Sequence, residues 1–322
     1  MTESLIFSLD GRQNLAKAIL GEAKYWALSL NTELGILQNQ KFSDGELCVD
    51  FTDSVRGKRV YLLSSPNISD EIMKLVLAID AAKINGASEI IPIIPYMPYA
   101  RQDRKSSLRS GIGAKVIANM IQNCGATTLI TFDLHALQIE GFFNIPILHI
   151  EGKDVFSEYI SSIANENTIL ASPDAGGVKR VKKIRDFINK YYGINLNYIT
   201  MDKTRTKANQ IDDMVIIGDV KGKDVIIIDD IVDTFGTADK AVNVLIENGS
   251  KSVSMIATHG VLSGPAIDRI SNSKLHELII SDSINTPIND KIKIVSVAKQ
   301  ISKAMLSINN NTSYENNSLK TE

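Results

Sequence analysis

The stretch "VIIIDDIVDTFGT", residues 225–237, shows most clearly how this chain folds. The apolar run at 225–228 predicts a buried strand, because strands covered on both faces of a parallel sheet are continuously apolar. Two adjacent acids, Asp229 and Asp230, follow the run, and Asp233 precedes a Thr-Phe-Gly-Thr turn. Apolar residues at helical spacing come next, so the stretch predicts the strand, turn and helix of an α/β fold.

The same stretch predicts a ligand site with two kinds of groups. The turn at 234–237 can hold a phosphate with its hydroxyls and with backbone N–H groups at a helix N-terminus. Asp229 and Asp230 would repel a phosphate beside them, but they can accept hydrogen bonds from sugar hydroxyls. A phosphosugar satisfies both requirements. The alternative is a plain strand–helix turn with Asp233 as the helix cap; it explains any single acid better, but not the pair together with the turn.

Strand-like and helix-like segments alternate along the rest of the chain. We expect strands at 59–65, 89–96, 127–133, 168–174, 195–201, 213–220, 225–230 and 251–260. Apolar residues at helical spacing predict the helices between them, one capped by Ser110 and another beginning near Gly177. This order predicts α/β architecture with mainly parallel sheets.

Length and an internal similarity indicate two domains. A chain of 322 residues exceeds what one core usually holds, and a strand–helix–Asn-Gly–strand pattern occurs twice. We expect domains at 1–148 and 149–308, with the last helix able to pack back on the first domain. The polar segment 309–322 is predicted to be disordered.

Composition excludes several classes of function. A net charge of −2 argues against a general nucleic-acid or anionic-membrane binder. Two cysteines make a disulfide framework improbable, and the N-terminus lacks the pattern of a signal peptide. No apolar run is long enough to span a membrane, so we expect a cytoplasmic protein.

Polar residues follow nearly every predicted strand, where open α/β sheets bind their ligands. They are "ARQDRK" (100–105), "DLHA" (133–136), "PDAGG" (173–177), "DKTRTK" (202–207), "DDIVDTFGT" (229–237) and "THG" (258–260). Six such ends predict a long polar cleft. P-loop and dinucleotide-binding glycine motifs are missing at the required positions.

Several of these residues have two interpretations. The basic loop after Ala100 suits a polyphosphate, or it is simply solvated. Lys203 and Arg205 share one face of an extended strand and suit an anionic transition state, although on a surface strand they would be solvated. His135 is by itself more typical of a structural histidine, and Asp174 of a helix cap. The basic helix that follows Gly177 is interpreted as a solvated face.

Taken together and in order, six motifs resemble the ribose-phosphate diphosphokinase (phosphoribosyl pyrophosphate synthetase) family over roughly residues 5–305. They are "FSDGE" (42–46), "PYARQDRK" (98–105), "DLHALQIEGFF" (133–143), "SPDAGGVKR" (172–180), "DDIVDTFGT" (229–237) and "THGVLSGPA" (258–266). The resemblance implies two similar phosphoribosyltransferase-type domains, each with a mainly parallel sheet flanked by helices. It places ATP on the first domain and ribose 5-phosphate on the second.

The resemblance also implies a reaction, a metal and an assembly. The anomeric hydroxyl of ribose 5-phosphate attacks the β-phosphorus of Mg-ATP, which yields phosphoribosyl pyrophosphate for nucleotide biosynthesis and releases AMP. Mg²⁺ is the implied cofactor. The implied assembly is a homo-oligomer of dimers built into a hexamer, with adenine contacts across subunits.

Site residues are carried over position by position from the matching motifs. Lys203 and Arg205 match the catalytic pair, and His135 and Asp174 match the magnesium positions. The residues expected to bind ATP are Phe42, Asp44, Glu46, Arg101, Gln102, Asp103, Arg104 and His135. Those expected to bind ribose 5-phosphate are Asp229, Asp230, Asp233, Thr234, Phe235, Gly236 and Thr237.

The chain departs from the family pattern at three places. Phe235 stands where the turn usually has a small residue, and we expect its ring to point away from the phosphate. Gly111 and Gly113 replace the usual sequence after the basic loop, which predicts a more mobile loop. The usual C-terminal segment, near the family's allosteric site, appears only as "TSYENN" (312–317), so effectors are not predicted.

Two other functions compete with an active diphosphokinase. A base phosphoribosyltransferase would consume the product instead, but the length of the chain, "FSDGE" and "RQDRK" argue against it. A catalytically silent synthetase-associated subunit should have damaged catalytic positions or an insertion in the basic loop. Neither is seen here.

Overall fold

The fold is described from a computed structural model that covers residues 3–25, 30–204, 213–287 and 289–314. The chain forms two compact units. The first holds the described residues of 1–150 and 297–318, and the second holds those of 151–296. No helix in these described segments is long and apolar enough to cross a membrane.

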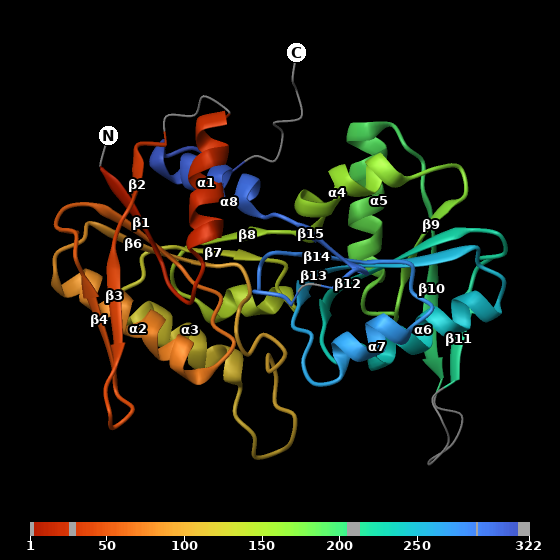
Figure 1. The fold of residues 1–322 in the computed structure, drawn as a ribbon, viewed down its shortest axis with the longest axis horizontal. Coiled ribbons are helices and arrows are strands. Elements are labelled where there is room, and N and C mark those ends of the chain that lie inside the picture. Colours follow the sequence, from red (N-terminus) through yellow and green to blue (C-terminus); the bar gives the residue numbers. More distant parts are fainter. Residues whose placement is uncertain (1–2, 26–29, 205–212, 288, 315–322) are drawn as a thin grey trace. The chain divides into compact units, whose positions relative to one another are not determined.

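The sheet of the first unit is parallel throughout. Its strand order is β2 (Thr32–Leu34), β1 (Ser4–Ser8), β5 (Arg59–Leu63), β6 (Glu89–Ile94), β7 (Leu129–Phe132) and β8 (Ile147–Ile150). Helices α1 (Gln13–Tyr25) and α8 (Ala298–Asn309) cover one face, and α2 (Ser69–Ile84) and α3 (Gly113–Cys124) cover the other (Figure 1). β5 is buried along its whole length, as expected for a strand covered on both faces.

The second unit repeats this design with one antiparallel edge strand. Its order is β11 (Asp213–Ile217), β10 (Asn197–Thr204), β9 (Thr168–Ser172), β12 (Asp224–Val232), β13 (Ser252–Gly260), β14 (Leu278–Ser281) and β15 (Ile292–Val295). Only the pairing of β10 with β11 is antiparallel among the described strands of this sheet. Helices α4 (Gly152–Ile163) and α5 (Val178–Tyr192) lie on one face, and α6 (Gly236–Glu247) and α7 (Ala266–Asn272) lie on the other (Figure 1). The predicted fold class is confirmed.

Two local predictions were wrong. Ser110 does not cap α3, which begins at Gly113 after Ile112; its hydroxyl instead closes a tight turn with Ser107. The strand predicted at 225–230 extends to Val232, so the acid pair lies within β12 and not at its end. β12 pairs with β13 as far as Val232, so Ile231 and Val232 belong to the sheet.

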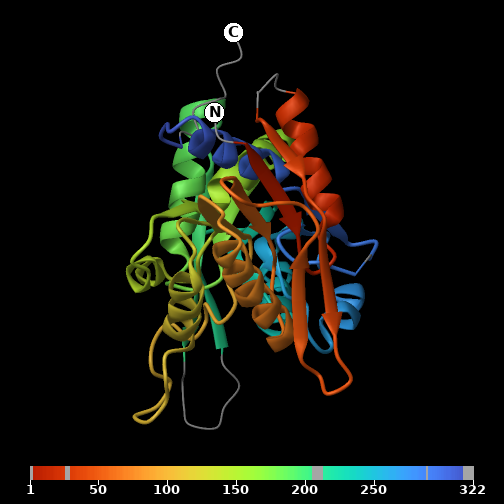
Figure 2. The ribbon, with the colours of Figure 1, turned by 90° about the vertical axis from the view of Figure 1, so that its left-hand side faces the viewer.

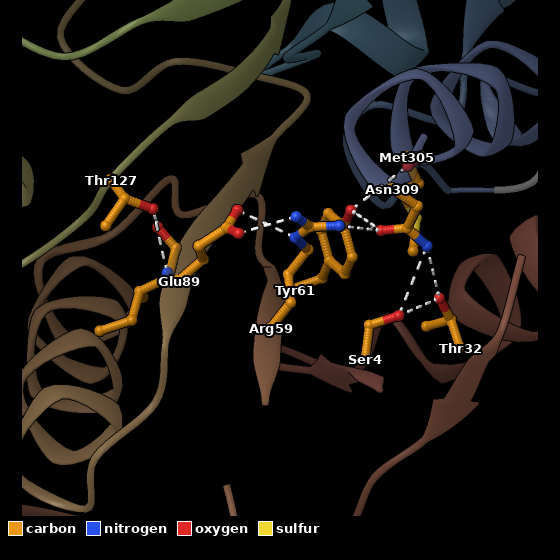
Figure 3. Close-up of polar contacts among 9 residues, drawn as sticks. Ser4, Thr32, Arg59, Tyr61, Glu89, Thr127, Met305 and Asn309 are labelled. Atoms are coloured by element: carbon orange, nitrogen blue, oxygen red, sulfur yellow. Dashed lines mark hydrogen bonds and ion pairs between the residues drawn. The ribbon is translucent and has the colours of Figure 1, made fainter. Parts of the chain in front are cut away.

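A buried polar cluster fastens α8 to the sheet of the first unit (Figure 3). Arg59 of β5 pairs with Glu89 through both carboxylate oxygens, at 2.9 and 2.7 Å, and donates to Asn309 Oδ1 at 2.8 Å. The Tyr61 hydroxyl donates to the same oxygen at 2.7 Å, and Asn309 Nδ2 donates to Leu30 O at 2.8 Å. Burial raises the pKa of Tyr61, although Arg59 acts against the shift, so the phenol stays neutral.

Replacing Asn309 by alanine should destabilise the protein, because Arg59 and Tyr61 would lose an acceptor in a buried place. We expect the free energy of unfolding to fall by about 1–3 kcal/mol, measured by urea denaturation. Asn310→Ala is the matched control, since its side chain is exposed. Equal effects of the two substitutions would contradict the role given to the cluster.

Candidate active site

The acid pair of β12 is held by an arginine from a neighbouring helix. Arg180 lies in the first turn of α5, with Nη1 at 3.6 Å from Asp229 Oδ1 and Nη2 at 3.3 Å from Asp230 Oδ1. The Asp230 side chain is 7% exposed and that of Asp229 29% exposed. Two adjacent carboxylates in this setting need a compensating cation, and Arg180 supplies it.

The pKa of Asp229 is raised well above its usual range. Burial is the main cause, and the hydrogen bond and negative charge of Asp230 add to it. Arg180 and the Asp230 N–H, which donates to Asp229 Oδ1 at 2.9 Å, act in the opposite direction. The pair therefore combines strong acceptors with an unfavourable charge, as expected of a site built for a ligand.

The turn at 233–237 presents polar groups outward and a phenyl ring inward. Thr234 and Thr237 are exposed, whereas Phe235 is only 2% exposed and belongs to the core beneath α6. Its backbone is left-handed, with φ of 61°, an uncommon conformation for a bulky residue. Burial of the ring holds it there, and the ring is not on the exposed side where a phosphate would bind. Phe235 can therefore contact a ligand only through its backbone.

Two further side chains brace this turn. Arg269 of α7 donates to Thr234 O at 2.9 Å, and Ser263 donates to the Asp233 carboxylate. A side chain at Gly236 would meet the Arg269 guanidinium at 3.0 Å, so this position favours glycine. The turn leads into α6, whose first N–H groups have no intrahelical acceptors and can bind an anion.

Asp174 lies at the end of β9, where the chain turns into α5. Its Oδ1 accepts the N–H of Gly177 at 2.9 Å, and its backbone carbonyl accepts the Ser172 hydroxyl at 2.6 Å. The helix-cap interpretation is wrong, because Gly177 is the N-cap of α5 and Asp174 closes the turn that precedes the helix. The half-buried carboxylate nevertheless keeps a second oxygen that can face a cation.

The expected catalytic pair is described only in part. Lys203 occupies a position on β10 opposite Met214 of β11. Its side chain, and the whole of Arg205, lie outside the described residues.

In the first unit, three of the residues expected to bind ATP lie at the tip of a hairpin. Strands β3 (Leu37–Lys41) and β4 (Leu47–Phe51) pair antiparallel and form a two-stranded arm (Figure 2). Phe42, Asp44 and Glu46 lie at the end of the arm, and all three are exposed. Phe42 is 45% exposed. The Glu46 N–H donates to Asp44 Oδ1 at 3.0 Å, which shapes the tip.

The basic loop runs from β6 to α3, and its expected ATP residues lie near its middle. Arg101, Gln102 and Arg104 are exposed, and Asp103 is half-buried. The structure shows why Gly113 follows this loop, because a Cβ there would meet Gln102 Oε1 at 2.6 Å and Tyr99 Cδ1 at 2.7 Å. A Cβ at Gly111 would meet nothing within 4 Å, so a side chain has room there but not at Gly113.

His135 is exposed just after β7, followed by the short helix η1 (Leu137–Phe142). Gln138 of η1 donates to Asp103 Oδ2 at 2.7 Å, so this segment and the basic loop are in contact. Within the described residues, no group of three or more His, Cys, Asp or Glu side chains could hold a metal ion.

Comparisons with known proteins agree with this arrangement. Residues 4–125 match the model for the N-terminal domain of ribose phosphate pyrophosphokinase, and residues 195–317 match a phosphoribosyl synthetase-associated domain. A ribose-phosphate pyrophosphokinase of Oceanobacillus iheyensis is 44% identical over 94% of this chain and 93% of its own length. The chain belongs to the ribose-phosphate pyrophosphokinase family.

Other members of the family give the same result. The relative from Porphyromonas gingivalis is 46% identical over 86% of this chain and 88% of its own length. A crystal structure of phosphoribosylpyrophosphate synthetase from Mycobacterium smegmatis matches with a TM-score of 0.85 and 31% identity. That match covers 96% of this chain and all of the other, so the family likeness extends over both units.

Sequence reasoning missed Arg180, which it placed on a solvated helix face. The missed signal is the position of the residue in the first turn of α5, directly after the polar end of β9. A helix that follows a parallel strand begins at the carboxyl edge of the sheet, so its first turn faces the neighbouring strand ends. Val181, Ile184 and Ile188 are buried on this helix, and Arg180 precedes the first of them.

Asp229→Asn should stabilise the folded protein at alkaline pH. A carboxyl whose pKa is raised by folding favours the folded state at low pH, and this contribution is lost as the pH rises through the raised pKa. The variant should therefore exceed the wild type in free energy of unfolding at about pH 8, with the difference shrinking toward about pH 5.

Urea denaturation at both pH values measures this difference. Asp219→Asn, at an exposed aspartate of the same unit, is the control and should show little change. A variant less stable than the wild type at the higher pH would show that the ionised pair stabilises the fold.

Proposed function

We propose that this chain transfers the β,γ-diphosphoryl group of ATP to the anomeric hydroxyl of ribose 5-phosphate, which yields phosphoribosyl pyrophosphate and AMP. One observation carries the proposal: the Arg180-braced acid pair and the exposed polar turn occur together in a member of the ribose-phosphate pyrophosphokinase family. The product would supply nucleotide biosynthesis.

The sugar phosphate fits the two halves of the β12–α6 segment. Asp229 and Asp230 accept hydrogen bonds from ribose hydroxyls, and the turn at 233–237 binds the 5-phosphate through Thr234, Thr237 and backbone N–H groups. Phe235 contributes its backbone only, because its ring is buried. Arg180 lies close to both acids and opposes the rise in the pKa of Asp229.

ATP binds to residues of the first unit. The exposed Phe42 ring stacks on adenine, with Asp44 and Glu46 as hydrogen-bonding partners. Arg101, Gln102, Asp103 and Arg104 contact the nucleotide from the basic loop, where guanidinium groups match phosphate geometry. His135 contacts the phosphates from the end of β7.

Mg²⁺ is the proposed metal, with Asp174 and His135 as its protein-side contacts. The carboxylate suits a hard cation, whereas the imidazole suits it less and would act through water or on a phosphate. Mg²⁺ usually takes few protein ligands together with substrate phosphates. The ion would neutralise charge on the phosphates of ATP.

Lys203 and Arg205 are proposed to neutralise the transferring group. Two cations aimed at a diphosphoryl group stabilise the charge that develops in the transition state. We also propose that the enzyme is cytoplasmic and forms dimers that assemble into hexamers. The two compact units would correspond to domains at 1–148 and 149–308, with α8 belonging to the first unit.

AMP formation from ATP and Mg²⁺ should depend strictly on ribose 5-phosphate, and chromatography of nucleotides measures it. Phosphoribosyl pyrophosphate should appear in equal amount. Activity that appears only with an added partner chain would favour the silent subunit. Consumption of phosphoribosyl pyrophosphate with a free base would favour the phosphoribosyltransferase.

A further inference from the structure

The imidazole of His149 joins the two ends of the segment that carries His135. His149 lies on β8, which pairs with β7. Its Nε2 accepts the backbone N–H of Leu134 at 3.0 Å, and its Nδ1 lies 2.7 Å from Glu140 Oε1. Leu134 and Glu140 begin and end the segment 134–140, so the side chain of His149 contacts both of its ends.

These two contacts fix the proton on the ring. A nitrogen that accepts an N–H carries a lone pair and no proton, so the proton of a neutral imidazole is on Nδ1, where it faces the Glu140 carboxylate. The His149 side chain is 8% exposed, whereas that of Glu140 is 45% exposed, so the ring itself is shielded from water. Glu140 thus favours the tautomer with the proton on Nδ1, in which Nε2 can accept the Leu134 N–H.

The contact with Leu134 lies beside a strained residue. Asp133 has φ of 34°, in the left-handed region that costs an L-residue about 1 kcal/mol or more. Its own N–H donates to Ile150 O at 2.8 Å, and the next N–H, that of Leu134, donates to His149. Two consecutive residues of β8 therefore hold both N–H groups at this chain reversal. The reversal directs the following residue, His135, to the surface.

The same segment also reaches the basic loop. Gln138 donates to Asp103, so the segment closed by His149 touches one proposed nucleotide residue and contains another, His135. A change in its backbone would therefore alter the ATP side of the site. The acid pair and the phosphate turn belong to the other unit and have their own supports, Arg180 and Arg269.

We propose that His149, oriented by Glu140, is a positioning residue for ATP binding, because it holds the segment 134–140 in the conformation that presents His135. The inference rests on the proposed function, which assigns His135 to ATP. His149 itself touches neither substrate in this account.

Two substitutions separate the roles of the ring nitrogens. In His149→Gln the side-chain amide oxygen reaches the place of Nε2 and can still accept the Leu134 N–H. In His149→Asn the shorter amide reaches only the place of Nδ1, near Glu140, and leaves Leu134 without its acceptor. The two variants differ by one methylene group, so they form a matched pair.

Calorimetry of Mg-ATP binding is the first readout, because it needs no turnover. His149→Asn should weaken binding about tenfold, the effect of one lost buried hydrogen bond, while His149→Gln stays within about twofold of the wild type. The dissociation constant for ribose 5-phosphate should not change in either. Equal Mg-ATP affinities in the two variants, or equal weakening for both substrates, would overturn the inference.

Nitrogen-15 NMR of the wild type tests the tautomer independently. We expect an unprotonated Nε2 and a protonated Nδ1 on His149 at neutral pH, and a protonated Nε2 would overturn the inference. If the wild type forms no AMP but the Gln and Asn variants still differ in Mg-ATP affinity, the proposed function fails and the inference stands. If the wild type forms AMP and the variants do not differ, the inference fails alone.

Discussion

The acid pair on β12 is the constraint on which the site depends. Two neighbouring carboxylates within a buried strand oppose each other and oppose burial, and both effects appear in the raised pKa of Asp229. The fold tolerates them because Arg180 approaches both from α5. Burial of the two carboxylates lowers the stability of the folded state. The same burial makes them strong acceptors for a ligand.

The turn that follows is also an unfavourable local feature that its surroundings hold in place. The left-handed backbone of Phe235 is uncommon for a bulky residue, and it persists because the ring packs in the core under α6. The ring faces inward, and the two threonines and the helix N-terminus face outward. Phe235 thus packs below the turn, and the polar groups of Thr234 and Thr237 stay exposed.

Features with a short-range signal could be predicted from the sequence. Continuous apolar runs such as 225–228 predicted strands β5 to β7 and β9 to β13, whereas β1 to β4, β8, β14 and β15 were not predicted. The motifs predicted the fold class and the family, both of which are confirmed. Contacts between distant residues could not be predicted. Arg180 lies 49 positions from Asp229, and His149 lies 15 from Leu134, so their roles depend on strand order and helix phase. Ser110 failed as a cap because its hydroxyl is satisfied by Ser107.

We propose that the acids bind the sugar while the turn binds the phosphate. Calorimetric titration of Asp230→Asn with ribose 5-phosphate and with inorganic phosphate tests it most directly. We expect about tenfold weaker binding of ribose 5-phosphate, and phosphate binding that is unchanged or tighter because a nearby negative charge is gone. Equal weakening for both ligands, or no change for the sugar phosphate, would contradict it.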